Sequence, residues 1–552
     1  MQPRNSTHNS LPTIMEDPKE GNNTYVHSFP NNQKSPGGNT PQRPMGTGMM
    51  RGHVNKVTFN VRQPPTEAPN STMPIRSNGI SPQPFSNTLQ NYIRSSERMH
   101  NGSSKHNFKN VFKNKFDGDY NPIDRPCGVI FEEDRRNAEY YSHLDEIDDE
   151  IIVSGAGDAP KCYETWGDAN FHPTLQNTIT KSGYTKPRKI QEFAIPIIAD
   201  GSDLIGQSET GSGKTGAYLL PIIDEMLKVE WKSGRRVPFA LIIAPTRELV
   251  LQIHEQARKF CDGSQYGCAK LYGQISNSYL QRELDSGCDI LVATPGRLTE
   301  FLSKGHVHLN KLRYVVLDEA DRLMEFNFAK EVTNILQSPL CAPLAQRQNL
   351  LFSATFPLEL QKYFREWVKD NAVTIRNDRS NQVNKNIIHT FICVEGVNKN
   401  RMCADIIVAE NEEAKKHGLS LRKTLVFVEK KKTSDMLALF LINNGIKALS
   451  INGDRSQEDR EKALNELRSG NIDVLVATDV AARGIDICGL DHVIIVELPN
   501  DFMTFIHRVG RTGRIKEGEA TTFYDPKKDY ILANDISNML RKAGQEVPDF
   551  IK

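Results

Sequence analysis

A glycine-rich turn followed by a lysine and a threonine occupies residues 208–215. Backbone N–H groups of such a turn can bind phosphates, while Lys214 reaches the outer phosphates and the Thr215 hydroxyl reaches Mg²⁺. The strict pattern has Gly where this chain has Ser208, and we expect the small serine to preserve the turn. The segment predicts a nucleoside triphosphate site.

Two adjacent carboxylates, Asp318 and Glu319, follow an apolar run at 315–317 that is typical of a buried strand. One carboxylate can hold a metal ion, and the other can position a water molecule. Each motif alone is weak, because glycine-rich turns also form ordinary loops and acidic pairs often end strands in solvent. Their order, with room for several βα units between them, predicts a nucleoside triphosphatase.

The bulk composition limits the class of protein. A chain of 552 residues predicts more than one domain, and a net charge of only +1 means that any basic nucleic-acid surface is local. The nine cysteines include no C-x-x-C pair, so we expect neither a zinc site nor a disulfide framework. The start of the chain lacks the apolar run of a signal peptide and no stretch is long enough to span a bilayer, so we expect a soluble intracellular protein.

Short apolar segments alternate with amphipathic helical segments from about Tyr163 onward, which predicts parallel sheets covered on both faces. A polar stretch at 376–382 interrupts the alternation, which then resumes. The expected fold is therefore α/β, with two tandem parallel-sheet domains joined by a short linker. The expected strands are 239–243, 290–293, 314–317, 349–352, 424–428, 473–477 and 492–496.

The N-terminal part is rich in Asn, Ser, Pro, Gly and Gln, so it cannot bury enough surface to offset its ordering entropy. Its basic and then acidic stretches fit a solvated tail or an interaction segment equally well. The predicted organisation is a disordered extension (1–160), a nucleotide-binding domain (161–375), a linker (376–385), a second domain (386–535) and a C-terminal tail (536–552).

Ligands of open α/β sheets bind at the carboxyl ends of strands, and both domains carry polar residues there. The second domain has no phosphate-binding loop of its own, but arginines follow its elements. This distribution indicates a partner domain that closes over a nucleotide held by the first.

Eight short segments occur along the chain in the order that is typical of the DEAD-box family of RNA-dependent ATPases, and the chain resembles this family over roughly residues 163–525. The segments that carry the resemblance are 183–187 with Gln191, 208–215, 245–249, 294–297, 318–321, 353–355, 482–486 and 507–514. The segments 523–526 and 545–550 most resemble the Vasa subfamily of germline helicases. The resemblance implies two RecA-like domains, with ATP and Mg²⁺ as cofactors.

The resemblance also implies roles at the nucleotide. Gln191 bonds the adenine edge and Tyr184 stacks on its face, while Asp486 contacts the ribose. The phosphates meet Thr210, Gly211, Ser212, Gly213, Lys214 and Thr215, and Mg²⁺ meets Thr215 and Asp318, partly through water. Glu319 orients or deprotonates the attacking water, and Arg511 and Arg514 act as arginine fingers beside the catalytic Lys214 and Asp318.

RNA contacts and interdomain coupling follow from the same resemblance. The RNA-facing residues are Thr246, Arg247, Gly273, Thr294, Gly296 and Arg297 in the first domain and Gly453, Thr478 and Arg483 in the second. Hydroxyls, arginines and glycine amides suit sequence-independent backbone contacts. Thr246 and Thr294 can alternatively cap helices, and Arg247 can pair with a carboxylate. Ser353, Thr355 and His507 couple the halves, and Asp321 ties motifs together structurally.

The implied activity is that of an ATP-dependent RNA helicase, an RNA-stimulated ATPase that bends one strand and separates short duplexes locally. A Vasa-like germline regulator is expected, with RNA and granule proteins as partners, no membrane and a monomeric core. The expected location is cytoplasmic, including germ granules, with nuclear access left open. An ATP-gated RNA clamp with slow turnover, a general translation-initiation helicase and a DNA-directed helicase stay open as alternatives.

Overall fold

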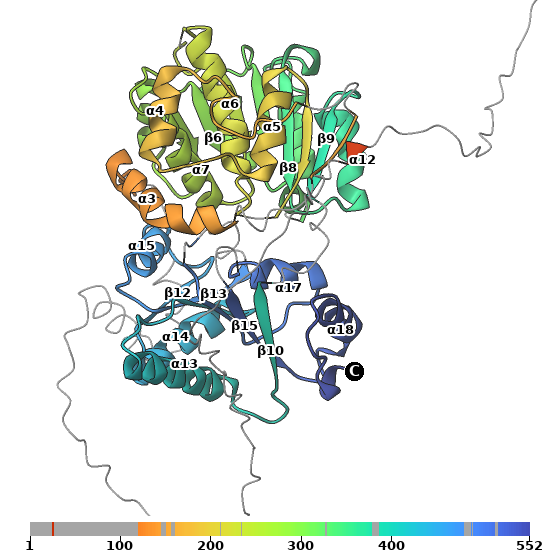
Figure 1. Ribbon diagram of the computed structural model, residues 1–552. Coiled ribbons are helices and arrows are strands. Elements are labelled where there is room, and N and C mark those ends of the chain that lie inside the picture. Colours follow the sequence, from red (N-terminus) through yellow and green to blue (C-terminus); the bar gives the residue numbers. More distant parts are fainter. Residues whose placement is uncertain are drawn as a thin grey trace, which may run out of the picture.

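The computed structural model describes residues 120–144, 151–155, 161–209, 211–232, 234–325, 328–377, 386–479, 487, 489–513 and 517–552, together with the two-residue strand β1 (Tyr25–Val26). Two α/β units lie one above the other in Figure 1, each built around its own sheet. The prediction of two tandem parallel-sheet domains is therefore confirmed. The linker residues 378–385 lie outside the described part.

Within the described residues, the first sheet has nine strands in the order β1-β2-β9-β3-β8-β7-β4-β6-β5. Its strands from β9 to β5 are parallel, whereas β2 runs antiparallel to β9. The central strands are buried along their whole length, and three of them (240–243, 290–293 and 314–317) have the continuous apolar sequence that such burial favours. The bounds are β2 (Ile151–Ser154), β3 (Leu204–Gln207), β4 (Ala240–Ile243), β5 (Cys268–Leu271), β6 (Ile290–Ala293), β7 (Tyr314–Leu317), β8 (Gln348–Ser353) and β9 (Val373–Asn377).

Helices cover both faces of this sheet (Figure 1). Several begin at a residue whose side chain accepts a backbone N–H of the first turn, such as Ser276 before α8. The bounds are α3 (Cys127–Leu144), α4 (Pro173–Lys181), α5 (Lys189–Ala199), α6 (Lys214–Lys228), α7 (Arg247–Phe260), α8 (Asn277–Ser286), α9 (Pro295–Ser303), α10 (Ala320–Glu325), α11 (Ala329–Leu336) and α12 (Leu358–Trp367).

In the part of the second unit that the structure describes, six parallel strands form the sheet in the order β10-β15-β14-β11-β13-β12. Two apolar clusters, one for each face, pack against it. Its elements are β10 (Ile387–Cys393), α13 (Lys399–Lys416), β11 (Thr424–Phe427), α14 (Lys431–Asn443), β12 (Ala448–Ile451), α15 (Gln457–Arg468), β13 (Val474–Ala477), β14 (His492–Ile495), α17 (Phe502–Val509), β15 (Gly518–Tyr524) and α18 (Ala533–Lys542).

Both predicted terminal segments contain ordered structure. Within the extension 1–160, residues 127–144 form α3, and β2 pairs with β9 while burying Ile151 and Val153. The strand β2 was not predicted, because its apolar run is only three residues long (151–153) and follows a strongly acidic stretch. At the other end, α18 crosses the predicted boundary at 535/536, and Ile551 lies buried in the second unit.

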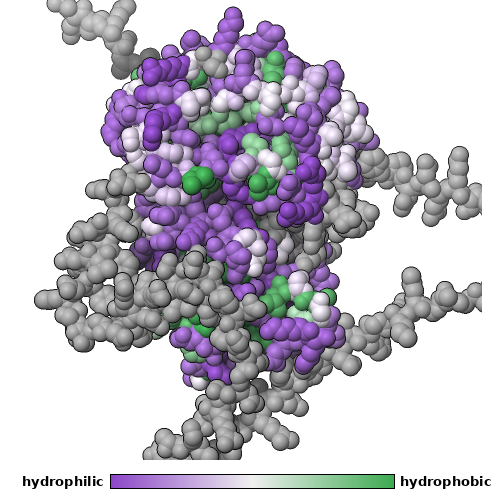
Figure 2. Space-filling view, turned by 90° about the vertical axis from the view of Figure 1, so that its left-hand side faces the viewer, coloured by the Kyte–Doolittle hydropathy of each residue, from purple (hydrophilic) through white to green (hydrophobic). Residues whose placement is uncertain are grey.

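The surface shown in Figure 2 is mainly hydrophilic, and its hydrophobic residues form small separate groups. Among the described residues, no helix combines the length and the apolar character needed to cross a bilayer.

One buried carboxylate holds the start of β3 against its neighbours. Asp203 is 1% exposed, and its oxygens accept the backbone and side-chain N–H groups of Asn349 (3.0 and 2.9 Å) and the backbone N–H of Lys369 (2.9 Å). The Lys369 ammonium lies 3.2 Å away. Three segments of the first unit therefore depend on this side chain.

We expect Asp203→Ala to lower the free energy of unfolding by about 3 kcal/mol, because it leaves several buried donors without an acceptor. Urea denaturation of the full chain, followed by tryptophan fluorescence, measures the change. Asp200→Ala is the matched control, since Asp200 pairs with Lys161 on the exposed surface and its loss should cost less than about 0.5 kcal/mol. Equal effects of the two substitutions would contradict the structural role given to Asp203.

Candidate active site

Adjacent parallel strands bring the two predicted nucleotide motifs to one edge of the first sheet. The order β3-β8-β7 places β8 between the strand that precedes the phosphate loop and the strand that precedes Asp318. The carboxyl ends of all three strands point to this edge, where ligands bind in open α/β sheets.

The phosphate loop leads directly into α6. Gly211 and Gly213 have φ values of +87° and +98°, a conformation that glycine adopts without strain. Lys214 begins the helix, and its ammonium donates to the carbonyls of Ser208 (2.6 Å) and Glu209 (2.7 Å). The Ser212 hydroxyl donates to the Glu209 carbonyl at 2.8 Å. The loop thus places a lysine and a helix N-terminus side by side, as phosphate binding requires.

The acidic pair lies buried beside this loop. Asp318 accepts hydrogen bonds from the Tyr218 hydroxyl (2.9 Å) and from the backbone N–H of Glu319 (2.9 Å). Glu319 has a φ of +50°, a strained value of the kind that clusters at functional sites. Burial raises the pKa of both carboxyls, although the charge of Lys214 acts against the rise at Asp318. Tyr218 was not predicted, and only its position one helical turn after Lys214 could have indicated it.

The side chain of Gln191 lies against the phosphate loop. Its amide donates to the Gly213 carbonyl at 3.0 Å, and its oxygen accepts the backbone N–H of Arg188 at 3.0 Å. A Cβ at Gly213 or Gly216 would lie 2.8 Å from the Gln191 nitrogen, so a side chain at either position would displace the Gln191 amide, and Gly213 also has a positive φ of +98°. The Arg188 guanidinium also bonds the Gly211 carbonyl, a contact that was not predicted. The predicted adenine site and phosphate site therefore form one connected structure.

The three residues predicted to couple the halves meet at Asp321. Its carboxylate accepts the hydroxyl (2.8 Å) and the backbone N–H (3.2 Å) of Thr355, while its own N–H donates to Ser353. His507 of the second unit approaches the same carboxylate, with 4.0 Å between Nε2 and the nearest oxygen. Asp321 thus joins three motifs, which agrees with the structural role predicted for it.

A cavity of about 440 Å³ opens between the units at this edge. Arg511, which is 5% exposed, reaches it from the second unit, and its positive charge lowers the pKa of Glu319 against the effect of burial. Thr210, Arg483, Asp486 and Arg514 lie outside the described residues. The predicted nucleotide-site residues that line the cavity are Tyr184, Gln191, Gly211, Gly213, Lys214, Thr215, Asp318, Glu319 and Arg511.

Two of the predicted RNA contacts in the first unit lie together. The Arg247 guanidinium lies against Gly273, where a Cβ would be only 3.1 Å from its nitrogen, and bonds Gln457 of the second unit at 3.4 Å. Thr246 caps α7 by accepting the N–H of Leu249 at 3.3 Å, which is its alternative role.

The remaining predicted RNA contacts follow strands of both units. Arg297 donates to the Ile275 carbonyl and also bonds Asn277, and Thr294 begins α9 without a side-chain cap. Gly296 occupies the first turn of that helix. In the second unit, the N–H of Thr478 donates to the carbonyl of Ile451, two residues before Gly453.

A buried ion pair joins the two units beside Arg247. Arg460 on α15 lies 2.6 Å from Glu248 on α7, and these side chains are 6% and 2% exposed. Because both residues stand in ordinary helical sequence, nothing in the pattern predicted their contact. The pair fixes the first turn of α7 against α15.

Two family models match the chain. The DEAD/DEAH box helicase model covers residues 188–363, and the model of the helicase conserved C-terminal domain covers residues 398–516. The chain belongs to the DEAD-box helicase family. These matched ranges contain the phosphate loop and acidic pair in the first unit and Arg511 in the second.

Curated DEAD-box relatives point to the predicted subfamily. The human protein named probable ATP-dependent RNA helicase DDX4 is 39% identical over 415 residues, which cover 74% of this chain and 56% of the relative. The mouse ATP-dependent RNA helicase DDX4 is 37% identical over 434 residues, 77% of this chain and 60% of the relative. The resemblance to Vasa-type DEAD-box helicases is confirmed, although the chain spans little more than half the length of these relatives.

Solved structures of DEAD-box proteins share the fold. Mss116 bound to single-stranded RNA and UDP-BeF has a TM-score of 0.61 at 25% identity, covering 71% of this chain and 82% of that chain. Dbp5 from S. cerevisiae, bound to RNA and ADP BeF3, has a TM-score of 0.59 at 25% identity, covering 70% of this chain and 94% of that chain. The prediction of two RecA-like domains is thereby confirmed.

We expect Glu319→Gln to stabilise the chain at pH 7 by about 1 kcal/mol. Burial raises the pKa of Glu319 above its ordinary 4.5, so the ionised side chain costs stability above that raised pKa, and the cost disappears as the pH falls to 4.5. The gain should therefore shrink on acidification, which urea unfolding between pH 4.5 and 8 measures.

Glu300→Gln is the matched control, because the pKa of Glu300 is shifted in the opposite direction to that of Glu319. Contacts with Lys304 and Arg297 lower the pKa of Glu300, so its neutralisation should give no gain in stability at pH 7. A Glu319→Gln variant that is less stable than the wild type at pH 7 would contradict a destabilising burial of the Glu319 carboxylate.

Proposed function

We propose that this DEAD-box chain is an ATP-dependent RNA helicase, an ATPase stimulated by RNA. The observation that carries the proposal is the composite cavity, which combines Lys214, Asp318 and Glu319 of the first unit with Arg511 of the second. Neither unit alone brings a phosphate loop and a second-domain arginine together. Hydrolysis therefore depends on closure of the two units.

ATP binding is proposed to use the loop and its neighbours. Lys214 and the N–H groups of the loop bind the outer phosphates, Gln191 bonds the adenine edge and Tyr184 stacks on its face. Thr215 and Asp318 line the same cavity with a hydroxyl and a carboxylate, the hard oxygen ligands that suit Mg²⁺. The ion would offset phosphate charge when bound. Thr210 and Asp486 are proposed to contact the phosphates and the ribose.

In the chemical step, Glu319 positions the attacking water and accepts its proton. Arg511, together with Arg514, stabilises the charge that develops on the transferred phosphoryl group, a contribution of about 10³–10⁵ in rate where an arginine finger acts. The raised pKa of Glu319 suits a group that must take up a proton near neutral pH.

RNA is proposed to bind across both units and to favour the same closed arrangement as ATP. Arg247, which lies against Gly273, already bonds Gln457 of the second unit, so a strand held there touches both halves. Thr294, Gly296, Arg297, Gly453, Thr478 and Arg483 complete the proposed RNA surface. Asp321 contacts His507 of the second unit, and it also bonds Ser353 and Thr355 of the first. This group is proposed to couple closure of the units to the nucleotide site. Bending of one strand then separates a short duplex locally.

The proposed biological setting rests on the resemblance to the Vasa subfamily. We infer a germline RNA regulator in cytoplasmic ribonucleoprotein granules, acting as a monomeric core with granule proteins as partners. A second candidate is an ATP-gated clamp that holds RNA with slow turnover. Three contacts between the units favour it, because all of them must break before the units reopen: Glu248 with Arg460, Arg247 with Gln457 and Tyr272 with Glu461.

The test is steady-state ATP hydrolysis by the full chain, with and without single-stranded RNA. We expect strong stimulation by RNA, weaker stimulation by DNA of the same sequence because 2′-hydroxyl contacts are lost, and a fall of at least about 10² in kcat for Glu319→Gln. A hydrolysis rate that does not change on addition of RNA, or a kcat of Glu319→Gln close to that of the wild type, would refute the proposal. Product release after a single turnover separates the clamp from the helicase.

A further inference from the structure

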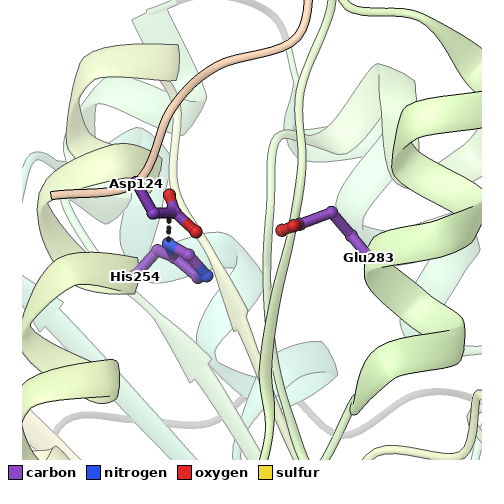
Figure 3. Close-up of side chains that lie close together, drawn as sticks. All are labelled: Asp124, His254 and Glu283. Atoms are coloured by element: carbon purple, nitrogen blue, oxygen red, sulfur yellow. Dashed lines mark ion pairs between the residues drawn. The ribbon is translucent and has the colours of Figure 1, made fainter. Parts of the chain in front are cut away.

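The residues before α3 meet a buried charged cluster on the first unit. Asp124, His254 and Glu283 bring three potential metal-binding atoms within 4.8 Å of one another (Figure 3). The ammonium of Lys270, a fully buried side chain, lies 2.5 Å from Asp124 and 3.4 Å from Glu283. His254 donates to the Cys268 carbonyl at 3.1 Å, and burial lowers its pKa to about 3, so its ring is neutral. The Arg258 guanidinium lies 3.8 Å from the other oxygen of Asp124. Two internal cations therefore already balance the two carboxylates, and the cluster is an anchor, not a metal site.

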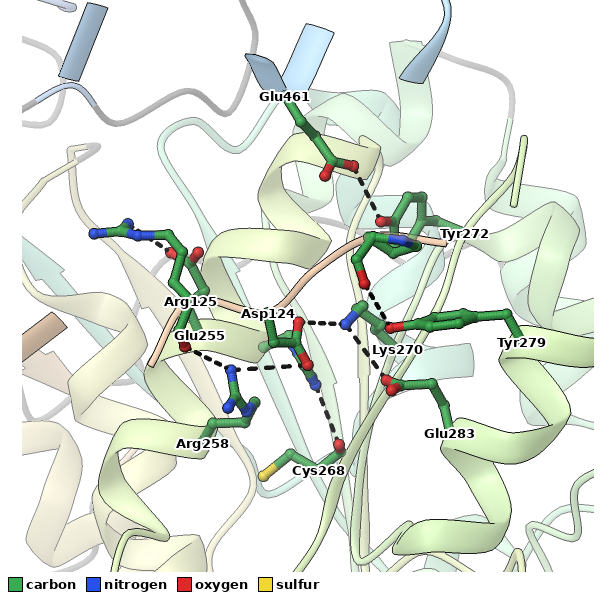
Figure 4. Close-up of polar contacts among 12 residues, drawn as sticks. Asp124, Arg125, Glu255, Arg258, Cys268, Lys270, Tyr272, Tyr279, Glu283 and Glu461 are labelled. Atoms are coloured by element: carbon green, nitrogen blue, oxygen red, sulfur yellow. Dashed lines mark hydrogen bonds and ion pairs between the residues drawn. The ribbon is translucent and has the colours of Figure 1, made fainter. Parts of the chain in front are cut away.

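This anchor fastens residues 120–137, which we call the strap, to the first unit. The Pro122 carbonyl accepts the Tyr279 hydroxyl at 3.0 Å, and the Arg125 carbonyl accepts Arg258 at 3.0 Å (Figure 4). The Arg125 guanidinium lies 3.3 Å from Glu255. Backbone and side chains of the strap are thus held by α7, α8 and β5.

Tyr120, the first described residue of the strap, contacts the second unit. The Tyr120 hydroxyl donates to Glu461 on α15 at 2.7 Å. The other oxygen of this carboxylate accepts the hydroxyl of Tyr272 from the first unit (3.2 Å) and the amide of Gln457 (3.1 Å). Glu461 is therefore a shared acceptor at the interface between the units, and the strap supplies the shortest of these three hydrogen bonds.

The other end of the strap meets the predicted adenine site. Asp134 lies 2.6 Å from the fully buried ammonium of Lys259, and both groups bond the Tyr184 hydroxyl, at 3.2 and 2.9 Å. The same end contributes Glu133, Asp134 and Asn137 to the wall of the nucleotide cavity. One continuous segment thus contacts the base-stacking tyrosine and the interface with α15.

We propose that the strap is a positioning element for ATP hydrolysis: its Tyr120–Glu461 contact holds the second unit closed over a nucleotide whose base-stacking side chain the strap also supports. This inference rests on the proposed function. Tyr120 touches no reacting atom and acts through Glu461, so its loss weakens closure without removing a chemical group. The strap makes the closed arrangement more favourable for both ATP and RNA.

The test compares Tyr120→Phe with the wild-type full chain in RNA-stimulated ATP hydrolysis. We expect the half-saturating RNA concentration and the KM for ATP to rise at least about tenfold, the effect of losing one hydrogen bond to a charged group. The saturated kcat should change less than about twofold, because the lost interaction is made equally in the ground and transition states. Tyr266→Phe is the matched control, since its hydroxyl bonds the Met226 carbonyl inside the first unit, and both constants should stay at wild-type values.

A double-mutant cycle decides whether the effect passes through Glu461. On a Glu461→Ala background, Tyr120→Phe should change neither constant further. Effects that multiply in the double variant, or a Tyr120→Phe chain that behaves like the wild type, would overturn the strap proposal. If the wild type itself lacks RNA-stimulated hydrolysis, the proposed function fails instead, and fluorescence energy transfer between labels on the two units still reports whether Tyr120 affects closure.

Discussion

The composite site depends on one buried contact between the units, the ion pair of Glu248 and Arg460. Breaking such a pair costs about 3–5 kcal/mol because an unpaired charge stays buried, even where the intact pair adds little net stability. Its effect is therefore on geometry: it fixes α15 against the start of α7. With this register set, Arg247 meets Gln457, Tyr272 meets Glu461, and Arg511 faces the acidic pair.

The acidic pair of the nucleotide site lowers the stability of the folded chain. Two adjacent carboxylates are buried at the end of β7, and burial raises the pKa of each. The carboxylate of Asp318 accepts hydrogen bonds from the Tyr218 hydroxyl and from the backbone N–H of Glu319. Glu319 itself has a strained backbone, and the positive charge of Arg511 from the second unit favours its ionised form. Buried charges and a strained backbone of this kind are typical of functional sites, where activity takes precedence over stability.

Local sequence patterns were sufficient to predict the buried strands and the phosphate loop. The apolar runs before Asp318 and from Thr424 predicted buried parallel strands, and the spacing of Gly211, Gly213 and Lys214 predicted a phosphate loop. Contacts between distant segments left no such signal. Glu248 and Arg460 lie in ordinary amphipathic helices. The charges around the strap fitted a solvated tail and an interaction segment equally well, and nothing in the sequence indicated that Asp124 and Asp134 pair with buried lysines. Pairing partners far apart in sequence are set by the folded register and not by any pattern around each residue.

The central claim is that ATP and RNA bind one closed arrangement of two units, so each must strengthen the binding of the other by the same factor. The most direct measurement is the Kd of a non-hydrolysable ATP analogue for the full chain, with and without saturating RNA, and the Kd of RNA with and without the analogue. We predict equal factors of at least about tenfold in both directions, and a smaller factor in Arg460→Ala. Affinities that are independent of the second ligand in the wild type would contradict the claim.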